Sequence, residues 1–150
     1  MEDRVYSKDI KTKGKSLFAK NEIKKGEIAL IIKGEIVNKP TIYTIPIEKD
    51  KFIDDSNLGR YLCHSCNPNC GIKDKTKIVA MRDIKKDEEI TIDYAMIVSR
   101  YENEMTNENR ICKCGEDNCR GELGEYSKLS SNLKKKYKGF ISEYLLKLNK

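Results

Sequence analysis

Three features are scarce in this 150-residue sequence: histidine, long hydrophobic runs and an apolar segment at the start. No run approaches the roughly 20 apolar residues that span a bilayer, so we expect no membrane contact. The missing apolar leader argues against a secreted framework of disulfides. We therefore expect a cytoplasmic protein, with the nucleus or secretion into a host as alternatives. The single histidine, His64, is expected to be structural rather than a catalytic base.

Charge, in contrast, is abundant. With 38% hydrophobic and 36% charged residues, the chain is expected to fold as one soluble globular domain. The net charge of +6, from 30 basic and 24 acidic residues, favours acidic partners only modestly. The basic run 134–136 falls in a helical pattern and is expected to be a solvated face. No aromatic residues interleave with the basic clusters, so nucleic acid is not an expected requirement. No particular oligomeric state is predicted.

Short runs of β-forming residues dominate the chain as far as Tyr94. They predict a mainly β protein with some α, built from several small sheets. Two similar segments, NEIKKGEIAL from Asn21 and RDIKKDEEITI from Arg82, each lead through charged residues into an apolar strand. We interpret them as paired turns rather than a repeat. The clearest strand candidates are residues 16–19, 28–32, 78–81 and 89–92.

The pattern becomes helical beyond Glu125. Apolar residues recur there every three or four positions, which predicts a helical stripe that packs in the core. Gly139 interrupts the stripe and predicts two short helices rather than one. Residues 102–109 are polar and predict a mobile connector. The stripe consists of Leu129, Leu133, Tyr137, Phe140, Tyr144 and Leu148.

Three cysteines lie close together in the second half, as C-x-C-x4-C at Cys112, Cys114 and Cys119. The first two are too close for an easy mutual disulfide. Glycine and polar residues separate the three, so free buried thiols of a core segment are the weaker interpretation. A closed structural zinc site needs four ligands, and the fourth must come from elsewhere in the chain. The candidates are Cys63, Cys66 and Cys70.

Four segments in order resemble those of SET-domain protein lysine methyltransferases with a post-SET zinc motif, of the small single-domain microbial type. They are KGKSLFAKNEIKKGEI at 13–28, RYLCHSCNPNC at 60–70, EEITIDY at 88–94 and CKCGEDNCRG at 112–121. The resemblance implies a SET fold of several small sheets with a knot-like C-terminal segment, a post-SET zinc loop and C-terminal helices. It also implies a SET domain over 1–100 (approximately 4–95), a zinc segment over 108–124 and a helical extension over 125–150.

The resemblance assigns the metal ligands. Cys66 would join Cys112, Cys114 and Cys119 around one structural zinc ion, which would hold the C-terminal segment over the active site. Cys63 and Cys70 would then be spare. An alternative remains open, because Cys63 and Cys66 have a C-x-x-C spacing that zinc accepts.

The resemblance also implies S-adenosylmethionine as the methyl donor, held largely by backbone groups of a loop that Gly14 opens. Two positions depart from the family pattern: Ser16 replaces a frequent glycine, and Cys63 replaces the usual asparagine. A thiol is a poor substitute for an amide, and a lost hydrogen bond costs about 0.5–1.5 kcal/mol, or up to roughly tenfold in affinity. The implied cofactor residues are Gly14, Lys15, Ser16, Leu17, Arg60, Cys63 and His64. Arg60 would lie near the cofactor carboxylate or brace the loop.

Methyl transfer requires a neutral lysine amine. With a pKa near 10.4, about one amine in a thousand is neutral at about pH 7.4, a cost of roughly 4 kcal/mol unless the site lowers that pKa. Tyr94 is implied to orient the amine and polarise the methyl group, whereas water removes the proton. Tyr61 and Ile92 would line the substrate channel, and Ile92, in place of a frequent aromatic residue, would leave room for more than one methyl group.

The sequence therefore predicts S-adenosylmethionine-dependent methyl transfer to a lysine of a histone or another basic protein. The substrate would dock as an extended segment against a sheet edge near residues 41–53. Two alternatives remain open: a catalytically weak SET-fold binding module, suggested by Ser16 and Cys63, and a small basic zinc protein that binds nucleic acid.

Overall fold

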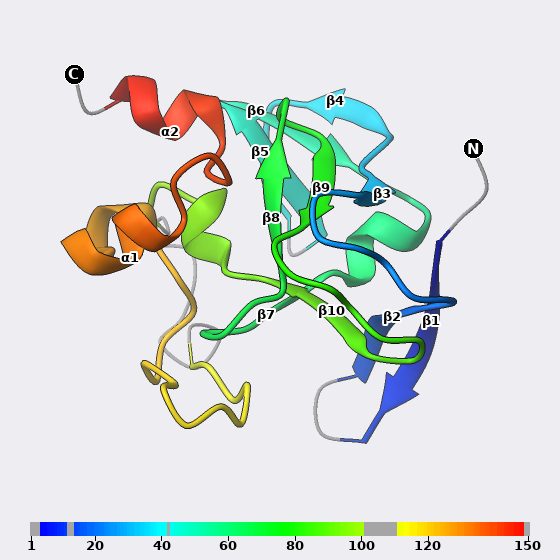
Figure 1. The fold of residues 1–150 in the computed structure, drawn as a ribbon. Helices are drawn as coiled ribbons and strands as arrows, with labels where there is room; N and C mark the ends of the chain where they lie inside the picture. Colours follow the sequence, from blue (N-terminus) through cyan, green and yellow to red (C-terminus); the bar gives the residue numbers. More distant parts are fainter. Residues whose placement is uncertain (1–3, 12–13, 42, 101–110, 149–150) are drawn as a thin grey trace.

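Short strands build most of the molecule (Figure 1). The computed structural model describes residues 4–11, 14–41, 43–100 and 111–148. Within these ranges, ten strands form one sheet of seven strands and one sheet of three. The expected mainly β fold with some α is confirmed. The predicted connector at 102–109 lies outside the described residues.

The larger sheet has the strand order β1-β2-β10-β8-β9-β3, and β7 pairs with β10 beside this path. All four strands predicted from the sequence are present in it, each within two residues of the predicted bounds. Its strands are β1 (Val5–Ile10), β2 (Gly14–Ala19), β3 (Ile28–Ile31), β7 (Cys63–His64), β8 (Cys70–Lys73), β9 (Lys77–Ala80) and β10 (Glu89–Ile92).

Strand β10 is central to this sheet. Ile90 lies opposite Leu17 of β2 in an antiparallel pair, and Ile92 lies opposite His64 of β7 in a parallel pair. Ile92 also pairs with Cys70 of β8. Both isoleucines are completely buried on one face, and Thr91 between them is buried on the other, as expected for a strand covered on both faces. Because β10 lies between strands that precede it in the chain, it fits the knot-like C-terminal segment implied by the family resemblance.

The smaller sheet has the order β4-β6-β5, with β4 at Glu35–Val37, β5 at Thr44–Glu48 and β6 at Lys51–Asp54. Both outer strands pair with β6 on one side only. The region predicted to receive a substrate, 41–53, therefore includes an edge strand, β5.

The two similar charged turns contact each other directly. Ile23 and Ile84 form an isolated antiparallel bridge, with N–H to carbonyl distances of 2.9 and 2.7 Å. Both side chains are completely buried. The interpretation of these segments as paired turns is confirmed.

Two short helices follow the strands, α1 (Ser131–Lys136) and α2 (Glu143–Leu148). The Ser130 hydroxyl caps α1 by accepting the N–H of Leu133 at 3.2 Å. Gly139 separates the helices with φ +87°, a conformation that favours glycine. The predicted division into two helices is confirmed, and the basic run 134–136 is exposed as expected.

The C-terminal helices pack against the sheets at the left of Figure 1, away from β1. Leu129, Tyr137 and Tyr144 of the predicted stripe are buried, and the backbone N–H of Ile72 donates to the carbonyl of Phe140 at 3.1 Å. The core prediction is wrong at Leu148, which lies in the last turn of α2 and is 47% exposed.

We predict that Ile72→Ala, which removes a completely buried side chain of β8, lowers the free energy of unfolding by about 2–5 kcal/mol. Ile36→Ala in β4 is the matched control, because Ile36 is 62% exposed and should change stability by less than about 0.5 kcal/mol. Urea unfolding followed by circular dichroism measures both values. Equal losses in the two variants would contradict the assignment of the core.

Candidate active site and metal centre

The candidate active site lies around the C-terminal end of β10. Antiparallel pairing brings Leu17 of β2 to the first half of one edge of the strand, parallel pairing brings Cys63 and His64 of β7 to the second half, and Cys70 of β8 pairs on the opposite edge. Tyr94 follows the strand and begins the 3-10 helix η2 (Tyr94–Met96). Four residues of β10 therefore bring together segments that are far apart in the sequence.

Tyr94 is held at both its backbone and its side chain. Its hydroxyl donates to the carbonyl of Leu62 at 2.9 Å, and its backbone N–H donates to Nδ1 of His64 at 3.0 Å. Burial raises the pKa of the Tyr94 hydroxyl, so the phenol keeps its proton at neutral pH. With that proton directed at Leu62, the lone pairs of the phenol oxygen remain available to accept a hydrogen bond.

His64 links Tyr94 to the cysteines. Because Nδ1 accepts from Tyr94, the ring proton is assigned to Nε2, which lies 3.4 Å from Sγ of Cys66. Nδ1 also lies 3.6 Å from a carboxylate oxygen of Asp93. The imidazole is buried and engaged at both nitrogens. This geometry suits the expected structural role and leaves the ring poorly placed to act as a base.

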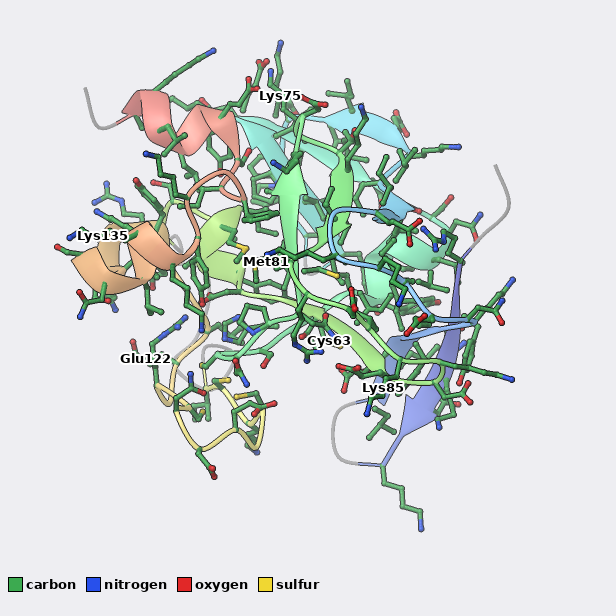
Figure 2. All side chains as sticks on the ribbon, in the orientation of Figure 1. Cys63, Lys75, Met81, Lys85, Glu122 and Lys135 are labelled. Atoms are coloured by element: carbon green, nitrogen blue, oxygen red, sulfur yellow. The ribbon has the colours of Figure 1, made fainter. Side chains whose placement is uncertain are left out.

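The two departures from the family pattern contact each other. Oγ of Ser16 lies 3.2 Å from Sγ of Cys63, which also lies 3.6 Å from the carbonyl of Lys15. Ser16 is completely buried, and Gly14, with φ +78°, begins β2, so the predicted cofactor loop at residues 14–17 is part of a strand. Figure 2 shows Cys63 near the centre of the view and Glu122 at the left, in the cysteine-rich segment, which we define as residues 112–124.

Two other predicted site residues differ in exposure. Nζ of Lys15 lies 5.3 Å from the ring centroid of Tyr61, so the partly exposed Tyr61 belongs to the same neighbourhood as the cofactor loop. Ile92 is completely buried in the hydrophobic core. Its place in a substrate channel stays a prediction.

Arg60 contacts a different loop. Its Nε donates to the carbonyl of Asp55 at 3.1 Å, and its guanidinium lies 4.3 Å from the ring centroid of Tyr43. Arg60 also forms an ion pair with Asp54 at 3.6 Å. These contacts do not involve residues 14–17, so both roles expected for Arg60, near the cofactor carboxylate or bracing the cofactor loop, stay predictions.

Four thiols form a cluster that suits a metal ion: Cys66, Cys112, Cys114 and Cys119. Their sulfur atoms all lie within 4.8 Å of one another, and those of Cys66 and Cys112 are 3.8 Å apart. Tetrahedral zinc with Zn–S bonds of 2.3 Å would separate its sulfur ligands by about 3.8 Å. The thiol donor set and its spacing therefore fit one structural zinc ion.

The protein environment favours a thiolate at Cys114, whereas burial raises the pKa of the Cys66 and Cys112 thiols. Burial raises the pKa of Cys114, but hydrogen bonds from backbone N–H groups oppose it and bring the value to about 7. The N–H groups of Arg120 and Gly121 lie 3.4 Å from Sγ of Cys66 and Cys119. Bound zinc would tie one cysteine of the central motif to three of the C-terminal segment, and its role there is structural.

The remaining two cysteines lie apart from this cluster. Cys63 faces Ser16 of the cofactor loop, and Cys70 is completely buried in β8, where burial raises the pKa of its thiol to about 12. Among the described residues, the metal-suited group therefore includes Cys66 rather than Cys63.

Asp93, Arg120 and Tyr137 were not identified as site residues from the sequence. Asp93 is completely buried directly before Tyr94, and both Arg120 and Tyr137 hydrogen-bond to its carboxylate. Two features of the sequence could have identified them: the pair Asp93–Tyr94, and the position of Arg120 directly after Cys119, a predicted zinc ligand. Tyr137 was interpreted only as a core residue.

Comparison with known proteins shows the family. The family model described as "SET domain" matches residues 14–95, more than half of the chain. The chain therefore belongs to the SET-domain family. The matched region includes the cofactor loop, β10 and Tyr94, and the division of the remaining chain at 100 and 125 stays a prediction.

Several relatives are curated histone methyltransferases. A "Histone-lysine N-methyltransferase, H3 lysine-36 specific" of Yarrowia lipolytica is 36% identical over 137 residues, covering 75% of this chain and 17% of the relative. One with the same name from Coccidioides immitis is 34% identical, covering 81% and 14%. An H3 lysine-4 specific enzyme of Aspergillus oryzae is 39% identical over 92 residues, covering 54% and 7%. The chain thus matches less than a fifth of the length of these relatives.

No helix in the described part of the chain is both long and apolar enough to cross a membrane.

We predict that the purified protein binds about one equivalent of zinc and that Cys114→Ser loses most of it, because a closed site needs all four ligands. Cys63→Ala and Cys70→Ala should keep the full equivalent, since neither thiol belongs to the cluster. Metal content measured by mass spectrometry on folded protein decides the matter. Loss of zinc in Cys63→Ala would instead support the alternative in which Cys63 is a zinc ligand.

Proposed function

We propose that this chain transfers a methyl group from S-adenosylmethionine to the side-chain amine of a lysine in a protein substrate. The observation that carries this proposal is the position of Tyr94, at the meeting point of the cofactor loop and the Cys63–His64 strand, with its hydroxyl proton directed at Leu62. Membership of the SET-domain family and the names of the curated relatives support the same reaction.

In this proposal, the cofactor loop and its neighbours hold the methyl donor. Backbone groups of Lys15, Ser16 and Leu17 bind it, and Cys63 and His64 complete the pocket. S-adenosylmethionine supplies an electrophilic methyl group on a sulfonium. The positive sulfonium and the surrounding apolar residues both lower the pKa of a lysine amine beside them.

Tyr94 then positions the reacting groups. Its phenol oxygen accepts a hydrogen bond from the amine and orients the nitrogen lone pair toward the methyl carbon. The bond from carbon to sulfur breaks as the bond from carbon to nitrogen forms. Because burial raises the pKa of Tyr94, the phenol is a poor proton acceptor, and water takes the proton of the amine.

The proposed substrate is a basic protein that presents a lysine in an extended segment, with histone H3 as the first candidate because of the names of the relatives. Strand β5 offers backbone groups on its unpaired side among the described residues, which supports docking of the substrate along 41–53. Cytoplasmic location, like the extent of methylation, stays a prediction.

A second candidate function is a catalytically weak SET-fold binding module. The contact between Oγ of Ser16 and Sγ of Cys63 favours it, because the thiol that replaces the usual asparagine already has a partner within the protein. This candidate predicts an intact zinc site with weak binding of S-adenosylmethionine.

We predict that Tyr94→Phe lowers transfer of labelled methyl to histone H3 by roughly tenfold or more, because the phenol oxygen that orients the amine is gone. Binding of zinc and S-adenosylmethionine should be retained. Tyr6→Phe is the matched control, since its hydroxyl contacts Asp87 near the end of the sheet formed by β1 and β2. No transfer by the wild-type protein despite cofactor binding would exclude H3, and unchanged transfer in Tyr94→Phe would contradict the assigned role.

We also predict that Cys63→Asn combined with Ser16→Gly strengthens binding of S-adenosylmethionine by up to roughly tenfold, as expected for one regained hydrogen bond. Both changes are needed because the two side chains are 3.2 Å apart and asparagine is larger than cysteine. Isothermal titration calorimetry measures the affinity of the wild type, each single variant and the pair. Unchanged affinity in the pair would show that the two departures do not limit cofactor binding.

A further inference from the structure

The buried carboxylate of Asp93 joins three segments of the chain. It follows β10 and is completely buried. Nη2 of Arg120, from the cysteine-rich segment, lies 2.8 and 2.7 Å from its two oxygens. The hydroxyl of Tyr137, at the end of α1, donates to Oδ2 at 2.8 Å, and the N–H of Ala95 donates to Oδ1 at 2.9 Å.

A carboxylate in such a place depends on its partners. Burying an ionised group without compensation is strongly unfavourable, and charge-assisted hydrogen bonds of this length are among the stronger ones. Arg120 supplies the positive charge, and Tyr137 and Ala95 satisfy further lone pairs. Loss of Arg120 would leave a buried negative charge one residue away from Tyr94, so the local backbone would have to adjust.

The cysteine-rich segment also contacts this carboxylate through its backbone. A Cβ atom added at Gly124 would lie 2.1 Å from Oδ1 of Asp93 and 2.6 Å from the backbone nitrogen of Ala95. Only a residue without a side chain fits this close approach. The segment therefore packs against Asp93 at two points, Arg120 and Gly124.

Arg120 contacts both the metal-suited cluster and the catalytic strand. It follows Cys119, and its backbone N–H lies 3.4 Å from Sγ of Cys66 while its guanidinium binds Asp93. A second connection runs through His64, which lies between Sγ of Cys66 and the backbone N–H of Tyr94. The contacts through Arg120 and His64 therefore connect the closed cysteine cluster to the position of Tyr94.

We propose that Arg120, supported by Tyr137, is a positioning residue that couples closure of the cysteine-rich segment to the placement of Tyr94. The role in methyl transfer rests on the proposed function, whereas the structural coupling does not. Arg120 acts through Asp93, and opening the cysteine cluster releases Arg120, deprives Asp93 of its counter-charge and shifts Tyr94.

The test uses the full chain labelled with 3-fluorotyrosine and observed by fluorine NMR, with the Tyr94 resonance assigned from Tyr94→Phe. We expect Arg120→Gln to shift that resonance, and removal of zinc from the wild type with a chelator to shift it as well. Arg120→Lys, which keeps the charge, should restore part of the wild-type position. A Tyr94 resonance that stays in place in Arg120→Gln, or after removal of zinc, would overturn the proposal.

Matched controls separate this coupling from general damage. Arg82→Gln also removes an arginine–carboxylate pair, with Glu88, but on the surface, and should leave the Tyr94 resonance unchanged. Tyr137→Phe should shift it, whereas Tyr6→Phe should not, because the hydroxyl of Tyr6 donates to Asp87 instead. If Arg120→Gln does not fold, Tyr137→Phe and removal of zinc from the wild type decide the outcome.

Steady-state kinetics gives an independent readout. Arg120→Gln should lower kcat by roughly tenfold or more and leave the KM for S-adenosylmethionine within about twofold, because the guanidinium is engaged with the carboxylate of Asp93. A raised KM with unchanged kcat would overturn its role in placing Tyr94. Absence of both methyl transfer and S-adenosylmethionine binding in the wild type would instead contradict the proposed function, and the fluorine spectra would still decide whether Arg120 couples the two sites.

Discussion

The pairing of β10 on both of its sides is the constraint on which the rest of this structure depends. Its first half pairs with β2 and its second half with β7 and β8, so one short buried strand fixes three parts of the chain relative to one another. This pairing leaves little freedom of register, because a shift by one residue would move Ile90 and Ile92 to the opposite face of the sheet. The register of β10 therefore determines the position of Tyr94, two residues beyond the end of the strand.

Next to this strand, the buried side chains of Asp93 and His64 both have hydrogen-bond partners. Asp93, His64 and the four clustered thiols lie within one continuous set of contacts that runs from the C-terminal helices to the backbone of Tyr94. Such networks are costly when they are only partly satisfied, which makes a single arrangement strongly preferred over alternatives. The cysteine-rich segment and the helices are therefore part of the same site as the SET domain and not separate appendages.

Much of this arrangement is predictable from the sequence, because local periodicity reflects local structure. The strand at 89–92, the two helices around Gly139 and the cysteine spacing each depend on neighbouring residues. The choice of Cys66 came from the family resemblance. The contacts of Asp93 with Arg120 and Tyr137 join residues 27 and 44 positions apart, and no local pattern encodes such a pairing. The exposure of Leu148 was missed for a related reason, since periodicity does not reveal where neighbouring elements end.

The order of the strands also bears on how the chain reaches its native state. β1 and β2 form a local hairpin, but β2 meets β10 across about seventy intervening residues, and Cys66 and Cys112 are 46 positions apart. Contacts between such distant residues form slowly, because the entropy of closing a long loop is lost before the contact stabilises it. On the ribosome, β2 emerges long before its partner exists. Its apolar residues, including Leu17 and Phe18, therefore stay exposed to solvent until β10 has been synthesised. During this interval, premature collapse and aggregation are the main ways in which folding can fail.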